Sequence, residues 1–222
     1  MPRLPHSCLA PARPGQHLPR RRRALAWLAA GIALPLAGCD QLLSSARSKL
    51  SAFKGVDITG ASYGRDFALT DFDGRRRTLA DFRGKVLMLY FGFVQCPDVC
   101  PTALTRAAAV MQALGPQSAD LQVVFVTVDP ERDTPALLRE YMKAFHPSFL
   151  ALTGSADEIR KTADEFKVFY QKVPTGSSYT MDHTALSYLF DRQGRLRVAL
   201  RHEQTVDDYT ADIRVLLGEA AS

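Results

Sequence analysis

Hydrophobic residues occur in short runs separated by polar segments. Two runs, at residues 85–93 and 121–128, have the length and the aliphatic and aromatic content of strands. Neither run alternates polar with apolar residues, which indicates strands buried on both faces of a sheet. Residues 102–114 lie between them and are rich in Ala and Leu, which favours a helix. A strand, a helix and a strand of these lengths predict a parallel pair with a right-handed crossover.

Helix-capping patterns predict three further helices. Residues 134–145 begin with Thr-Pro, which suits an N-cap followed by the first helical position. Residues 155–166 and 205–217 begin with Ser or Thr followed three residues later by Glu or Asp, as in a capping box. The chain therefore continues with helices after the two buried strands.

Turn residues predict two hairpins. One spans residues 66–79 around Asp73-Gly74, ahead of the buried strands, and the other spans residues 185–202. Between them, residues 168–173 predict a short strand and residues 174–180 a polar loop. The order of elements predicts an α/β thioredoxin-like fold with an N-terminal β-hairpin extension and an inserted helix and loop.

The N-terminal segment has the pattern of a secretory signal. Arg20–Arg23 form a basic block, residues 24–36 are apolar but short for a membrane span, and the segment ends in Leu-Ala-Gly before Cys39. This ending resembles the lipobox of bacterial lipoproteins, in which the signal is removed and the cysteine is lipidated. The alternative is an uncleaved signal anchor in which Cys39 has no special role.

These features divide the chain into three parts. Residues 1–38 are expected to be the signal peptide, residues 39–60 a lipid-anchored tether, and residues 61–222 the folded domain. Asp40 resembles the residue that retains many lipoproteins in the inner membrane. We therefore expect a protein of the bacterial cell envelope that faces the periplasm.

The part of the chain after the expected leader differs from the whole chain in net charge and in number of cysteines. The chain has 28 basic and 23 acidic residues. Six of the basic residues lie within 1–38, so the remainder has a net charge of −1, which gives no indication of nucleic-acid binding. Of the four cysteines, Cys8 lies in the leader and Cys39 at the expected anchor, which leaves Cys96 and Cys100 in a compartment where disulfides form.

Cys96 and Cys100 are the first candidates for chemistry. They follow the first buried strand at a spacing of four, which predicts that both side chains lie on the first turn of the next helix. Helix amides would favour their thiolates, which are nucleophiles and soft-metal ligands. An inert disulfide between them remains an alternative.

His183 is the candidate third group. It lies where a loop is expected to meet a strand, and a thioredoxin-like topology would place it opposite the cysteines. Two thiolates and an imidazole suit Cu(I), whereas structural zinc would need a fourth ligand. A histidine at such a position can also be merely structural. Asp98 can tune the charge of the cysteines or simply solvate the turn. Asp129 and Asp133 can support the metal ligands or dock a partner, although a loop or capping role is the simpler interpretation.

Three motifs together resemble the Sco/SenC family of copper-binding proteins. They are CPDVCP at residues 96–101, VDPERDTP at 128–135 and YTMDHT at 179–184. The resemblance covers about residues 60–219. It implies a thioredoxin-like fold, copper bound by Cys96, Cys100 and His183, and membrane tethering.

The family resemblance also implies a role and partners. Such a protein helps to assemble the CuA centre of cytochrome c oxidase, and its partners would be the oxidase subunit that carries CuA, a copper donor and a thiol reductant. The alternative function is a thiol–disulfide oxidoreductase that reduces the cysteines of the oxidase subunit through Cys96 and Cys100. A thiol peroxidase is a weaker third option. Three residues between the cysteines, and a histidine near the usual position of the cis-proline, favour the metallochaperone over an enzyme.

Overall fold

The structure is a computed structural model that describes residues 52–219. The expected signal peptide, the lipobox and Cys39 lie outside the described residues. The sixteen elements in chain order are β1 (Val56–Asp57), β2 (Ala68–Asp71), β3 (Arg76–Thr78), η1 (Leu79–Phe82), β4 (Val86–Gly92), α2 (Val99–Leu114), η2 (Gly115–Asp120), β5 (Leu121–Thr127), α3 (Pro135–Phe145), β6 (Leu150–Thr153), α4 (Ala156–Glu165), β7 (Tyr170–Thr175), β8 (Ser178–His183), β9 (Leu186–Phe190), β10 (Leu196–Arg201) and α5 (Val206–Gly218).

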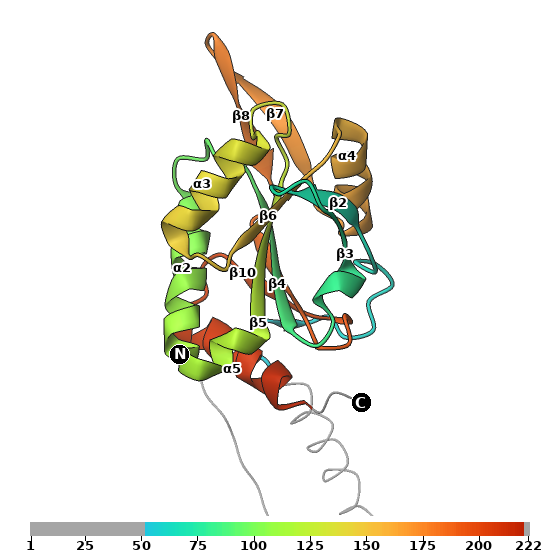
Figure 1. Cartoon of the computed structure of the whole chain (residues 1–222), viewed down its shortest axis with the longest axis vertical. Helices are drawn as coiled ribbons and strands as arrows, with labels where there is room; N and C mark the ends of the chain where they lie inside the picture. Colours follow the sequence, from blue (N-terminus) through green and yellow to red (C-terminus); the bar gives the residue numbers. More distant parts are fainter. Residues whose placement is uncertain (1–51, 220–222) are drawn as a thin grey trace, which may run out of the picture. The chain divides into compact units, whose positions relative to one another are not determined.

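An eight-stranded sheet in the order β1-β10-β9-β4-β5-β6-β2-β3 forms the centre of the domain (Figure 1). Every residue of β4 is buried, as its apolar run predicts for a strand covered on both faces. It pairs in parallel with β5 and antiparallel with β9. This order confirms the predicted parallel crossover and the thioredoxin-like fold.

The residues of β4 point alternately to two layers of the core. On one face, Tyr90 lies near Phe125 and donates its hydroxyl toward Cys100 of α2. On the other face, the ring of Phe91 packs against Phe166, which caps the C-terminal end of α4. Consequently β4 is held from both sides where its carboxyl end leads to Cys96.

The predicted caps are present where the sequence indicates them. Thr134 accepts a hydrogen bond from the amide of Leu137 at the start of α3. Capping boxes begin α4 and α5, at Ser155 and Thr205 respectively. The predicted hairpins correspond to β2–β3 and β9–β10.

Two expectations about local structure are wrong, and one strand was not expected. The folded domain begins before residue 61, because β1 pairs with β10 through Val56 and Ala199. Residues 174–180 are a β-hairpin and not a polar loop: β7 and β8 pair from Tyr170 opposite His183 to Thr175 opposite Ser178. The main sheet also gains β6, which the sequence analysis did not predict.

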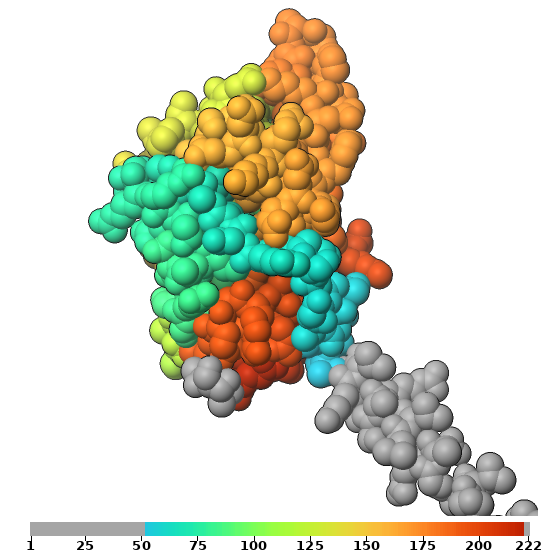
Figure 2. Space-filling view, turned by 90° about the vertical axis from the view of Figure 1, so that its right-hand side faces the viewer, coloured from blue at the N-terminus to red at the C-terminus, as the bar shows by residue number. Residues whose placement is uncertain are grey.

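The β7–β8 hairpin forms a second, two-stranded sheet. Only the turn at Gly176, with φ of 61°, separates its strands. In the space-filling view it projects from one end of the domain, coloured orange (Figure 2). Within residues 52–219 no strand pairing joins it to the main sheet, so side-chain contacts help to hold it in place.

Candidate metal centre

The two cysteines lie on either side of the start of α2. Cys100 is the second residue of that helix and is completely buried, whereas Cys96 is half-buried in the loop that follows β4. The prediction that both occupy the first helical turn is therefore wrong, because the helix begins only after Asp98. The amide of Cys100 nevertheless donates to the Sγ of Cys96 at 3.4 Å, so the helix start binds the sulfur as expected.

Gly92 allows the helix to approach the strand closely. A Cβ atom at this position would lie 2.8 Å from the Sγ of Cys100 and 2.8 Å from the ring of Phe125. Only a residue without a side chain fits there without displacement of these groups. The last residue of β4 thus determines where the Cys100 sulfur lies.

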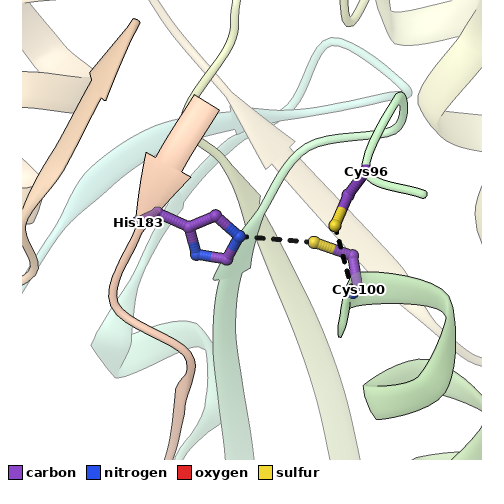
Figure 3. A group of neighbouring side chains, drawn as sticks. All are labelled: Cys96, Cys100 and His183. Carbon is purple, nitrogen blue, oxygen red and sulfur yellow. Dashed lines mark hydrogen bonds between the residues drawn. The ribbon is translucent and has the colours of Figure 1, made fainter. Parts of the chain in front are cut away.

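His183 is the last residue of β8 and faces the two cysteines (Figure 3). Its Nε2 lies 3.5 Å from the Sγ of Cys100, and its Nδ1 lies 3.1 Å from the carbonyl oxygen of Thr184. A carbonyl can only accept, so Nδ1 carries the proton and donates it, which leaves Nε2 free to bind a metal in the neutral ring. The ring is packed edge-on against Phe93 and Tyr90.

The three groups form a possible metal-binding set. One ligand atom from each of Cys96, Cys100 and His183 lies within 4.8 Å of the other two. Two soft sulfurs and an imidazole nitrogen match the preference of copper, and of Cu(I) in particular. The donor set therefore fits the ion that the sequence predicts.

The two thiols differ in acidity. A hydrogen bond from Cys100, supported by backbone amides, lowers the pKa of Cys96 to about 3. The same interaction with Cys96, together with burial, raises the pKa of Cys100 above its usual value. At neutral pH the apo site thus holds one thiolate and one thiol, and Cys96 is the more exposed nucleophile.

Two buried aspartates support the site, although loop or capping roles were the simpler expectation for them. Asp133 is 1% exposed and accepts hydrogen bonds from the hydroxyl of Thr127 and the amide of Val94, which fixes the start of the cysteine loop. Burial raises its pKa to about 6. Asp129 is equally buried and accepts hydrogen bonds from Arg132 and Tyr179. The position of both acids just after a buried strand could have indicated this role.

Asp98 lies at the start of α2. It is exposed and precedes α2 as its N-cap residue, and its carboxylate accepts a hydrogen bond from Thr102 at 3.2 Å. Its side chain therefore makes a local contact at the helix start.

Comparisons with known proteins agree with the motifs. A profile of the SCO1/SenC family matches residues 56–218. A SCO2-like protein of Rickettsia felis is 41% identical over 135 residues, which is 60% of this chain and 66% of the relative, just under two thirds of its length.

Solved structures of similar proteins extend the match. The copper-bound structure of ScoI from Bradyrhizobium japonicum is 40% identical, with a TM-score of 0.65, and covers 70% of this chain and 99% of that one. A SCO1/SenC family lipoprotein of Bacillus anthracis is 25% identical, with a TM-score of 0.60, and covers 70% and 98% of the two chains. Within residues 52–219, no helix has the length and hydrophobicity needed to cross a membrane.

Proposed function

Because the chain belongs to the SCO1/SenC family, we propose that it is a membrane-anchored copper metallochaperone. It binds Cu(I) or Cu(II) through Cys96, Cys100 and His183, and it helps to assemble the CuA centre of cytochrome c oxidase. Its partners are the oxidase subunit that carries CuA, a copper donor and a thiol reductant.

The observation that carries this proposal is the convergence of three ligand atoms within 4.8 Å, one of them from an imidazole ring whose Nδ1 faces a carbonyl oxygen. Three protein ligands leave a coordination position open for a ligand of the receiving protein. The copper-bound ScoI relative supports the choice of metal. The site is thus suited to hold copper and also to release it.

Copper binding tests the proposal directly. We expect the full-length protein in detergent to bind one copper ion per chain, and His183→Ala to weaken Cu(I) binding at least about tenfold, measured by competition with a chromophoric chelator. His146→Ala is the matched control, since His146 contacts Ser148 away from the cysteines. Equal affinity of the His183→Ala variant and the parent would reject the ligand role.

A thiol–disulfide oxidoreductase is the second candidate. The low pKa and partial exposure of Cys96 favour it, because Cys96 could attack a partner disulfide and Cys100 could then resolve the mixed disulfide to form the Cys96–Cys100 bond. This function would be favoured if the metal-free protein rapidly reduces the oxidised cysteines of the CuA subunit. The His183→Ala variant should then reduce them at the same rate. The metallochaperone instead requires copper transfer that depends on His183.

We further propose that Cys39 is lipidated and anchors the protein in the inner membrane, with the folded domain in the periplasm. The description of the B. anthracis relative as a lipoprotein supports this. We expect Cys39→Ala to prevent lipid attachment and to release the protein from the membrane fraction. Normal cleavage and membrane association of that variant would contradict the anchor.

A further inference from the structure

The two halves of the metal centre are held by different parts of the chain. Cys96 and Cys100 follow the central strand β4, whereas His183 belongs to the separate β7–β8 sheet. The 3.5 Å distance from His183 to Cys100 therefore depends on whatever keeps the hairpin against the cysteine loop. The ring of His183 itself packs on Phe93 and Tyr90. The loop after β5, residues 129–133, supplies further contacts between the hairpin and the cysteine loop.

Arg132 contacts both halves at once. Its Nη1 donates to the Oε1 of Gln95, next to Cys96, at 3.0 Å. The same nitrogen donates to the carbonyl oxygen of Tyr179, in the strand that ends at His183, at 2.8 Å. One guanidinium thus links the cysteine loop to the histidine strand.

Tyr179 and Asp129 fix this guanidinium in place. The guanidinium carbon lies 3.7 Å from the centre of the Tyr179 ring, and the Nε of Arg132 donates to Asp129. The Tyr179 hydroxyl donates to the other oxygen of Asp129 at 2.9 Å. The Asp129 side chain is fully buried and that of Arg132 only 16% exposed, so water competes little for these bonds.

We propose that Arg132 is a positioning residue that holds the β7–β8 hairpin so that His183 meets the two cysteines. The positioning role does not depend on the proposed function. Only its expected effect on copper binding rests on that function. Stacking on a ring while donating to three acceptors requires the planar guanidinium fork, which lysine lacks. Arg132→Lys keeps the positive charge beside buried Asp129 but cannot make all of these contacts.

Amide hydrogen exchange of the copper-free, full-length protein tests the positioning role without any metal. We expect Arg132→Lys to accelerate exchange at residues 179–183 at least about tenfold while the amides of α4 remain protected as in the parent. Arg139→Ala is the control, because Arg139 binds Phe72 and Asp73 in the turn between β2 and β3. Unchanged exchange at residues 179–183 in Arg132→Lys would overturn the proposal.

A double-mutant cycle then tests whether Arg132 acts through His183. We expect Arg132→Lys to weaken Cu(I) binding about tenfold in the parent, and less than about twofold in the His183→Ala background. The same loss in both backgrounds would overturn the proposal, because it would show an effect independent of the histidine. Absence of copper binding in the parent would refute the proposed function instead, and hydrogen exchange would still decide the role of Arg132.

Discussion

Cys100 and His183 lie 3.5 Å apart but depend on different interactions. Cys100 is completely buried between α2 and a strand whose residues are all buried. His183 is partly exposed at the end of a two-stranded hairpin, where its ring packs on Phe93 and Tyr90. Polar contacts from residues 129–133 bind the same hairpin through Tyr179. The cysteine half is fixed by core packing, and the histidine half by the edge-on contacts of one ring and a few hydrogen bonds.

This difference bears on the proposed release of copper. Opening the cysteine half would disrupt the domain core, which is costly. Opening the hairpin breaks a small set of hydrogen bonds, each worth about 1 kcal/mol. We therefore expect the histidine to be the ligand that moves, while the two sulfurs keep their positions.

The largest effect should follow loss of a core sulfur. Cys100→Ser replaces a soft ligand with a hard hydroxyl at a position that cannot adjust, so Cu(I) affinity should fall by more than about 100-fold. Chelator competition measures the loss, and the unfolding midpoint verifies that the variant is folded. Retention of affinity within about tenfold of the parent would show that Cys100 is not a principal ligand.

The next largest effect should come from steric crowding at Gly92, the last residue of β4. Gly92→Ala places a methyl group 2.8 Å from both the Cys100 sulfur and the ring of Phe125. Overpacking of this kind lowers the free energy of unfolding by about 1–3 kcal/mol, which thermal denaturation would detect as a lower midpoint.

Gly218→Ala is the control for that experiment, since nothing lies within 4 Å of a Cβ atom there. Copper affinity should also fall in Gly92→Ala, because the sulfur must shift. A Gly92→Ala variant as stable as Gly218→Ala would contradict the close approach of α2 to β4.

Most of the cysteine half could be predicted from sequence, because its determinants are local. The apolar run of β4, the capping residues of α3 and the β-branched run of β5 each specify their own element. Cys96 was wrongly placed in the first turn of the helix, since the four-residue cysteine spacing also suits a loop that precedes the helix.

The histidine half was harder to predict, because long-range contacts determine it. Residues 174–180 are polar and contain Gly176, a pattern shared by loops and by exposed hairpins. The strand β1 has only two residues, both exposed, and β6 has only four. The link from Arg132 to Gln95 spans 37 residues, so no local pattern reveals it.

A pH-dependent effect should come from Asp133, which supports the cysteine half. Its folded pKa of about 6 exceeds the unfolded value of 3.8, so the folded protein binds this proton more tightly. Its contribution to stability is present below about pH 4 and is lost as the pH rises to about 6, with an upper bound of about 3 kcal/mol. Asp133→Asn removes this contribution because the amide does not titrate.

Urea unfolding of the parent and of Asp133→Asn between pH 4 and 7 measures that difference. The free energy of unfolding of the variant, relative to the parent, should rise with pH through this window. Asp120→Asn, which alters an exposed aspartate paired with Arg192, is the control for a change of charge. A difference between parent and Asp133→Asn that stays constant with pH would rule out the raised pKa.

The smallest effect should come from removal of one hydrogen bond in the histidine half. Tyr179→Phe removes the 2.9 Å bond to Asp129 but leaves the ring beneath Arg132 and the ion pair between Arg132 and Asp129. The loss should be about 1 kcal/mol of hairpin stability, and therefore about fivefold faster amide exchange at residues 179–183. Tyr170→Phe, at the other end of the same hairpin, controls for loss of a hydroxyl. If Tyr179→Phe has as large an effect as Arg132→Lys, the tyrosine hydroxyl supplies the main restraint on the hairpin. The guanidinium of Arg132 would then not determine the position of His183.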